Sequence, residues 1–196
     1  MYEHKQRRWL ERTKWGDVAD TVRRWRAGES VRWSHALKRY DNAPDAERRG
    51  MRALDVGCGA GHGVLMLLDK GYAQVDAVDK WEGVSPVFAG NPRIQFFCMD
   101  FDGFAAKPGR YDLITCCDAI EHLPHPRATL KKFRRWLKDD GRVLMTIPFE
   151  GKSTPNPFHL HAWTYREAQA LVSEHFQIAE NLDTPLHNSL WVILQK

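Results

Sequence analysis

From residue 53 onward, short apolar runs alternate with stretches that carry helical periodicity or helix-end signals. The stretch 125–138 places Leu130, Phe133 and Leu137 on one helical face, and 63–71 ends at Gly71, a residue typical of helix C-termini. Such alternation predicts an α/β fold with a mainly parallel sheet and helices on both faces. The strand-like runs are 53–57, 74–79, 94–100, 111–118 and 141–148.

The C-terminal part predicts an antiparallel end to the sheet. Thr164 and Glu167 have capping-box spacing, so a helix is expected from there to about Phe176. Two further strand-like runs, 177–183 and 189–196, are joined by a turn too short for a crossover helix, so they should pair antiparallel. The chain is therefore expected to form a seven-stranded, mainly parallel sheet whose last strand is antiparallel.

The first fifty residues differ from the rest in charge. Residues 1–52 hold 14 Lys and Arg against 8 Asp and Glu, whereas 53–196 hold 15 against 17. We predict two parts: an N-terminal helical segment over 1–50, which caps the substrate pocket, and a main domain over 51–196. The basic excess suits either an anionic partner or the solvated faces of surface helices.

Composition and cysteine spacing argue against membrane-spanning segments and against disulfide bonds. The chain is 43% hydrophobic, yet it has no apolar run of the roughly 18–20 residues that cross a bilayer. The four cysteines show no CxxC spacing, which favours buried free thiols in a reducing compartment. A cytoplasmic location is therefore expected.

A glycine-dense turn, ALDVGCGAGHG at 53–63, follows the first strand-like run. Gly57, Gly59 and Gly61 are spaced G-x-G-x-G, and His62 stands where a dinucleotide fingerprint has its third glycine. No Lys-Ser or Lys-Thr pair follows, so the turn is not a P-loop. Asp55 precedes the first glycine by two residues, and its carboxylate opposes a phosphate but suits a cationic ligand.

Two more acidic residues indicate which other groups such a ligand carries. Asp79 ends the second run, where a carboxylate grips vicinal ribose hydroxyls. Asp100 ends the third run and is followed by Phe101, a pair suited to an exocyclic amine and an aromatic ring face. S-adenosylmethionine fits this combination of adenosine, ribose, positive charge and absent pyrophosphate.

With these motifs in this order, residues 50–196 resemble the class I S-adenosylmethionine-dependent methyltransferases. The resemblance implies a Rossmann-like three-layer sandwich with a seven-stranded sheet and a reversed last strand. It also implies roles by position: the three glycines line the methionine part, Asp55 orients its ammonium group, and Asp118 lies beside the methionine end and the substrate. The remaining cofactor-binding positions are Asp79 at the ribose, Asp100 and Phe101 at the adenine, and Lys80 beside Asp79 in sequence.

The methyl acceptor is less well defined. Asp118, Glu121 and His122 have i, i+3, i+4 spacing after the fourth strand, and His159 and His161 lie on the connection after the fifth. His122, His159 and His161 are the candidate general bases. The favoured function is an enzyme that methylates an oxygen, nitrogen or carbon of a small molecule, with no residue assigned as a metal ligand.

Two alternatives stay open. The DAIEHL and HLHAWT segments resemble in outline those of the small-RNA 3′-terminal 2′-O-methyltransferases, in which such residues hold a divalent metal; Asp118 here replaces a glutamate of that pattern. RNA is thus the less favoured partner, supported by the basic, Trp-rich N-terminus. The other alternative is a non-catalytic, methyltransferase-like partner subunit. The acceptor and the oligomeric state are left open.

Overall fold

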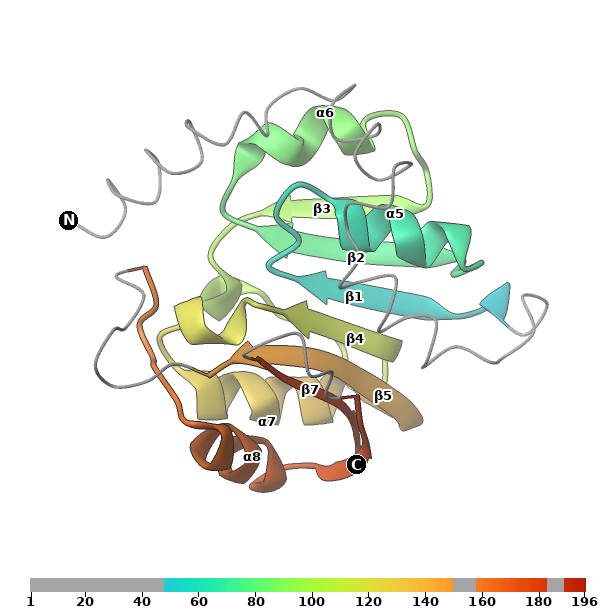
Figure 1. Cartoon of the computed structure of the whole chain (residues 1–196). Helices are drawn as coiled ribbons and strands as arrows, with labels where there is room; N and C mark the ends of the chain where they lie inside the picture. Colours follow the sequence, from blue (N-terminus) through green and yellow to red (C-terminus); the bar gives the residue numbers. More distant parts are fainter. Residues whose placement is uncertain (1–47, 150–157, 183–188) are drawn as a thin grey trace.

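A computed structural model describes residues 48–149, 158–182 and 189–196 (Figure 1). The helices expected within 1–47 and the turn at 184–188 lie outside these ranges. The elements in chain order are β1 (Arg52–Val56), α5 (His62–Asp69), β2 (Gln74–Asp79), η1 (Glu82–Val84), α6 (Ser85–Phe88), β3 (Ile94–Cys98), η2 (Phe101–Gly103), β4 (Tyr111–Cys117), η3 (Ile120–His122), α7 (Pro126–Trp136), β5 (Leu137–Pro148), α8 (Tyr165–Ser173), β6 (Gln177–Asn181) and β7 (Ser189–Gln195).

The described strands form one seven-stranded sheet in the order β3-β2-β1-β4-β5-β7-β6. The first five strands are parallel to one another. β7 lies between β5 and β6 and is antiparallel to both. The prediction of a mainly parallel sheet with an antiparallel last strand is confirmed.

Two hydrophobic cores lie on opposite faces of this sheet. Successive strand side chains point to opposite faces, so Leu54 joins the core under α7 and α8, while Ala53 joins the core under α5 and α6. Figure 1 shows α7 and α8 on one side of the sheet and α5 on the other. The molecule is thus a three-layer α/β/α sandwich, with strands buried on both faces.

The expected helix start at Thr164 is confirmed by its capping box. The Glu167 carboxylate accepts a hydrogen bond from the Thr164 backbone N–H at 2.8 Å, and the Thr164 hydroxyl accepts one from the Glu167 N–H at 3.3 Å. This exchange satisfies two N–H groups that a helix start leaves without partners. α8 ends at Ser173, three residues before the expected Phe176.

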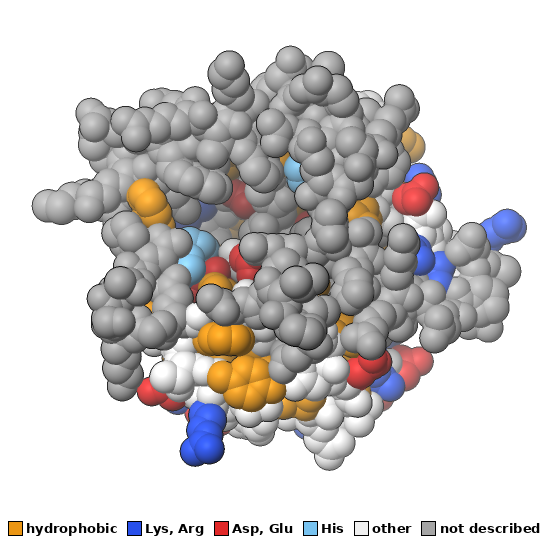
Figure 2. Space-filling model, in the orientation of Figure 1, with side chains coloured by type: hydrophobic (Ala, Val, Ile, Leu, Met, Phe, Trp, Pro, Cys, Tyr) orange, Lys and Arg blue, Asp and Glu red, His pale blue; other side chains and the backbone are white. Residues whose placement is uncertain are grey.

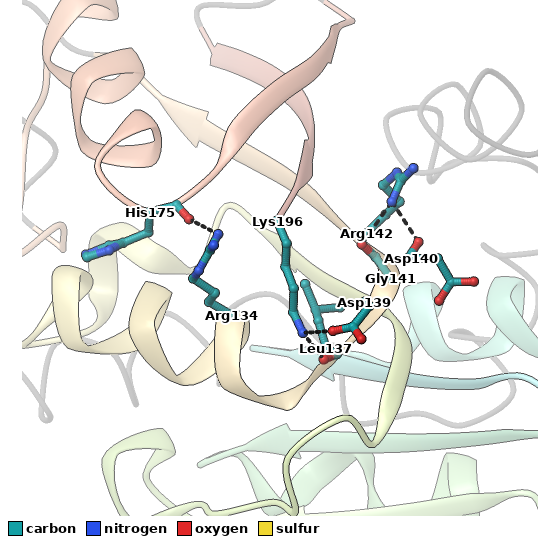
Figure 3. Close-up of polar contacts among 8 residues, drawn as sticks. All are labelled: Arg134, Leu137, Asp139, Asp140, Gly141, Arg142, His175 and Lys196. Carbon is teal, nitrogen blue, oxygen red and sulfur yellow. Dashed lines mark hydrogen bonds and ion pairs between the residues drawn. The ribbon is translucent and has the colours of Figure 1, made fainter.

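The fifth strand begins earlier than expected. The prediction started it at Gly141, but β5 starts at Leu137 and includes the Asp-Asp-Gly run. Lys196 contacts these first residues (Figure 3): its ammonium donates to the Leu137 carbonyl at 2.6 Å and contacts the Asp139 carboxylate at 3.2 Å. The pairing with β4 is irregular here, because Tyr111 lies opposite Leu137 whereas Leu113 lies opposite Arg142, so the turn signal coincides with an interruption inside the strand.

Other expectations concern the cysteines and the membrane. Cys58 and Cys116 are buried free thiols as predicted, but Cys98 is exposed, because it ends edge strand β3. Within the three described ranges, no helix is long and apolar enough to cross a membrane.

Candidate active site

The predicted site residues gather at one edge of the sheet. β1, β2, β4 and β5 run parallel, so their carboxyl ends and the loops that follow lie along the same edge. Open α/β sheets bind ligands in the crevice outside these strand ends. Figure 2 shows acidic and histidine side chains together in the hollowed middle of one face.

The glycine turn between β1 and α5 has three left-handed backbones, with φ of 70° at Gly57, 50° at Gly59 and 84° at Gly61. A Cβ added at Gly57 would lie 2.6 Å from the Ala119 Cβ, and one at Gly61 would lie 2.7 Å from the Phe88 ring. At Gly59 no described atom lies within 4 Å of the added Cβ. Gly57 and Gly61 are therefore required by packing, whereas none of the described residues fills the space beside Gly59.

Asp79 ties this turn to the end of β2. Its Oδ2 accepts a hydrogen bond from the Gly59 N–H at 2.8 Å, and its Oδ1 accepts one from the Trp81 N–H at 2.8 Å. Burial raises the pKa of this carboxyl group, and the two N–H donors act in the opposite direction. A carboxylate has about four acceptor positions, so each oxygen can still accept a ribose hydroxyl.

Asp55 is fully buried at the end of β1. Its Oδ1 accepts a hydrogen bond from the Thr115 hydroxyl at 2.8 Å, while its Oδ2 has no hydrogen-bond partner in the described part of the chain. Burial, with a smaller contribution from the charge of Asp79, raises the pKa of Asp55 to about 7, although the hydrogen bond from Thr115 acts in the opposite direction. A buried carboxyl oxygen of this kind fits a cofactor that brings an ammonium group to the turn.

The predicted adenine site looks different in the structure. Lys80 and Asp100 form an exposed ion pair with 2.7 Å between Nζ and Oδ1. The Phe101 ring is buried and packs edge-on against Phe133 and Trp136 of α7. We expected this ring to face adenine, but the η2 turn directs it into the core instead.

Asp118 follows β4 with a left-handed backbone, φ 48°, which is the one such non-glycine residue in the described ranges. Thr146 of β5 holds it there: the Asp118 N–H donates to the Thr146 hydroxyl at 2.9 Å, and this hydroxyl donates to Asp118 Oδ1 at 2.9 Å. Left-handed non-glycine residues are uncommon and concentrate at functional sites. Sequence reasoning missed Thr146, because only the fold brings it beside Asp118.

Glu121, His122 and His159 converge just beyond Asp118, and one ligand atom from each lies within 4.8 Å of the other two. Glu121 is 1% exposed, and its Oε1 lies 3.8 Å from Nε2 of both histidines. The two imidazole rings meet edge to face with centroids 4.8 Å apart. Glu121 was part of the i, i+3, i+4 pattern, but sequence reasoning did not select it as a site residue.

His161 has a different position. Its Nε2–H donates to the Leu123 carbonyl at 3.0 Å, and its ring stacks on Trp163 with centroids 5.1 Å apart. Among the described residues, neither His161 nor Asp118 belongs to the cluster of Glu121, His122 and His159. His161 instead holds the segment that carries His159 against the end of η3, through its hydrogen bond to Leu123.

Comparison with known proteins gives a consistent family. A family model described as a methyltransferase domain matches residues 23–188. The ubiquinone biosynthesis O-methyltransferase of Neisseria meningitidis is 31% identical over 108 residues, which cover 52% of this chain and 45% of that protein. The corresponding protein of Idiomarina loihiensis is 31% identical over 103 residues, with 50% and 42% covered. The chain thus spans about half the length of the curated relatives that it matches.

Solved structures share the fold. A Haloferax volcanii methyltransferase in complex with the Trm112 activator superposes with a TM-score of 0.68 at 17% identity, over 91% of this chain and 96% of that one. The Burkholderia thailandensis 1,6-didemethyltoxoflavin-N1-methyltransferase, solved with bound 1,6-didemethyltoxoflavin and S-adenosylhomocysteine, superposes with a TM-score of 0.59 at 20% identity, over 90% of this chain and 84% of that one.

Proposed function

Because the chain belongs to the class I S-adenosylmethionine-dependent methyltransferases, we propose that it transfers the methyl group to a hydroxyl oxygen of a small molecule. S-adenosylmethionine supplies a methyl carbon that its sulfonium activates. An oxygen acceptor is supported by the names of the relatives, which are O-methyltransferases. It is also supported by the histidine and carboxylate groups beside the cofactor turn, because a hydroxyl must lose a proton on methylation.

One observation carries the proposal: the cofactor turn and the polar cluster adjoin. Gly57 lies so close to Ala119 that a Cβ would not fit between them, and η3 with Glu121 and His122 begins at the next residue. Methyl transfer is an in-line displacement, whose rate depends on holding the acceptor oxygen against the methyl carbon. An acceptor between the turn and the cluster meets this requirement.

In this proposal, each step of binding and proton transfer is assigned to particular residues of the chain. Asp79 binds the ribose hydroxyls and Asp55 the ammonium group. Asp118, held by Thr146, lies between cofactor and acceptor. His122 and His159 face the acceptor hydroxyl and serve its deprotonation, and His161 positions the segment of His159.

The cofactor-binding domain is proposed to cover 51–196, whereas the cap predicted over 1–50 falls almost wholly outside the described residues. A cytoplasmic location is supported by four free cysteines.

The test offers the protein a panel of phenols, alcohols, amines and single-stranded RNA as methyl acceptors. Methylation is measured by the release of S-adenosylhomocysteine. Hydroxyl compounds of small size are expected to be methylated. Glu121→Gln removes the carboxylate that lies 3.8 Å from Nε2 of both histidines and that favours the imidazolium formed when either takes the proton. It should lower turnover about 100-fold, within the range of lost acid–base assistance, and leave S-adenosylhomocysteine affinity unchanged. His125→Gln, a change at a nearby exposed histidine, is the control. Turnover on RNA or amines alone, or equal turnover of Glu121→Gln and wild type, would show the proposal to be wrong.

A further inference from the structure

β3 is one of the two edge strands of the described sheet (Figure 1). Among the described strands it pairs only with β2, and this pairing runs without a bulge from Ile94 to Cys98. The sequence of the strand, Ile-Gln-Phe-Phe-Cys, holds no charged residue and no proline. Edge strands in natural proteins usually carry charges, prolines or bulges, which keep other chains from pairing with them. β3 lacks these protections.

β6, at the opposite edge, has two of them. Its pairing with β7 shifts register between Ile178 and Glu180, and the Glu180 side chain adds an exposed charge. A bulge bends and twists an edge strand, and a charge is costly to cover. Of the two edges, β3 is therefore the one suited to receive a further strand.

Alternate residues of β3 and its flanks direct their backbone groups toward β2. The Val75 N–H donates to the Arg93 carbonyl at 2.8 Å, at the start of the strand. The Met99 N–H donates to the Asp79 carbonyl at 2.9 Å, at its end. In a parallel pair the bonding residues alternate along each strand. The odd-numbered residues from Arg93 to Met99 thus face β2, and the even-numbered ones between them face outward.

The outward-facing residues are Ile94, Phe96 and Cys98. The Ile94 N–H donates to the Asn91 carbonyl at 3.1 Å, whereas on this side the backbone groups of Phe96 and Cys98 have no partner among the described residues. A hollow of about 250 Å³ borders the first part of the strand, and residues 92–96, Gln74 and Asp76 line it. The edge is therefore open to an incoming strand.

These open groups are arranged symmetrically about Phe96, the middle residue of the five. Two copies of the chain related by a two-fold axis at Phe96 lie antiparallel, with all five residues overlapped. Each Phe96 N–H then donates to the Phe96 carbonyl of the other copy, and each Cys98 N–H donates to the Ile94 carbonyl of the other copy. A two-fold interface requires this kind of self-complementarity, in which the same surface serves both partners.

The side chains agree with the same register. Phe96 comes opposite its own copy, on the side where it meets the Phe88 ring with centroids 5.5 Å apart, and aromatic pairs across strands are stabilising. At each end, exposed Arg93 comes beside exposed Asp100 of the other copy. The Lys80 ammonium contacts Asp100 at 2.7 Å, but a carboxylate has acceptor positions for a second cation. Opposite charges thus meet at both ends of the pair.

We propose that β3 is a self-association surface, on which a second copy of this chain pairs antiparallel and joins the two sheets into one. The proposal does not depend on the function proposed above, because it uses no residue of the acceptor cluster. With five residues in each strand the interface is small, so the dimer is expected to be weak and to form as concentration rises.

The test is sedimentation velocity of the full chain across micromolar concentrations, with a reducing agent present to exclude disulfides. Wild type is expected to shift from monomer to dimer. Cys98→Pro removes an outward N–H without removing a bond to β2, and should weaken dimerisation about 10-fold or more. Cys98→Ala removes the same thiol but keeps the N–H, so this control should dimerise like wild type.

Arg93→Glu is a second variant, at an exposed position just before the strand. It places an acid beside Asp100 of the other copy while leaving the backbone of β3 unchanged. Dimerisation should weaken about 5-fold at low salt and by less at high salt, because ions screen exposed charges. Circular dichroism and urea unfolding show whether each variant is folded.

Hydrogen exchange identifies the surface, because the amides of Phe96 and Cys98 should exchange more slowly as the dimer forms. Wild type that stays monomeric across these concentrations leaves the edge to a different partner and overturns the proposal. Dimerisation that is as strong in folded Cys98→Pro and Arg93→Glu as in wild type also overturns it. A dimer in which these two amides gain no protection places self-association on another surface, with the same consequence.

Discussion

The proposed site has a donor half, the glycine turn with Asp55 and Asp79, and an acceptor half, Glu121, His122 and His159, and the two are built in different ways. The donor half uses backbone conformation and carboxylates within 25 residues of sequence, from Asp55 to Asp79, and its glycine turn is closed by the hydrogen bond from Gly59 to Asp79. The acceptor half uses side chains 38 positions apart, joined by hydrogen bonds of Leu160 and His161 to Glu121. The donor half is therefore defined by local sequence, whereas the acceptor half depends on contacts between segments far apart in the chain.

The largest effect should separate packing glycines from ligand-facing ones. Gly57→Ala puts a Cβ against Ala119 in a left-handed backbone, and should lower the free energy of unfolding by roughly 2–5 kcal/mol. Gly59→Ala meets no described atom and should cost only about 1–2 kcal/mol, from its backbone alone.

Urea unfolding measures the difference in stability between the two variants, and calorimetry measures the affinity of each for S-adenosylhomocysteine. Gly59→Ala should remain folded and lose affinity for S-adenosylhomocysteine, because its methyl group enters the open space. Equal stability losses in the two variants would argue against the different roles of these glycines.

Asp55→Asn should stabilise the protein and weaken cofactor binding. The pKa of Asp55 is about 7 in the folded chain against an ordinary 3.8, so the folded state holds a proton that the unfolded state releases between pH 4 and 7. Wild-type stability therefore falls as pH rises through this window. The asparagine variant lacks this loss and should be more stable by roughly 2–4 kcal/mol at pH 8, but not at pH 4.

Urea unfolding at pH 4, 6 and 8 checks the sign, with exposed Asp140→Asn as the control. A stability difference between Asp55→Asn and wild type that is the same at all three pH values would rule out the buried carboxyl group as its source.

Asp79→Asn tests whether one carboxylate organises the donor half. The substitution weakens two charge-assisted hydrogen bonds, from Gly59 and Trp81, and removes the negative charge expected at the ribose. We expect S-adenosylhomocysteine affinity to fall about 100-fold, equivalent to about 2.7 kcal/mol. Isothermal calorimetry beside Asp140→Asn is the measurement, and unchanged affinity would contradict the assigned role.

Thr146→Val should have the smallest effect of these substitutions, and it tests how Asp118 couples the two halves of the site. It removes the hydroxyl that bonds both the backbone and the carboxylate of Asp118, at a cost of about 1–2 kcal/mol in stability. Turnover should fall more than cofactor affinity, because Asp118 lies toward the acceptor. Steady-state kinetics and calorimetry on one preparation decide this, and a loss confined to cofactor affinity would place Asp118 wholly in the donor half.

Sequence reasoning succeeded where the determinants are local. The strand ends at Asp79 and the capping box of Thr164 are set by neighbouring residues, and the structure has both where the sequence predicts them. The expected ring contact of Phe101 was wrong, because packing against α7 decides which way the ring points.

The acceptor half was predicted as a set of residues but not as an arrangement. Spacing grouped Asp118 with Glu121 and His122, but the left-handed backbone at Asp118 and its bond to Thr146 direct this carboxylate to β5. The pairing of His159 with Glu121 depends on backbone hydrogen bonds between segments far apart in sequence, which no local pattern reports.

The position of β7 bears on how the chain acquires its structure. Residues 189–195 come after every other described strand, yet they fill a buried place between β5 and β6. Until this segment arrives, β5 has an open apolar edge of the kind that pairs with other chains. Removing residues 189–196 would thus take out an interior strand and separate β6 from the sheet, so the sheet cannot close before this segment has been synthesised.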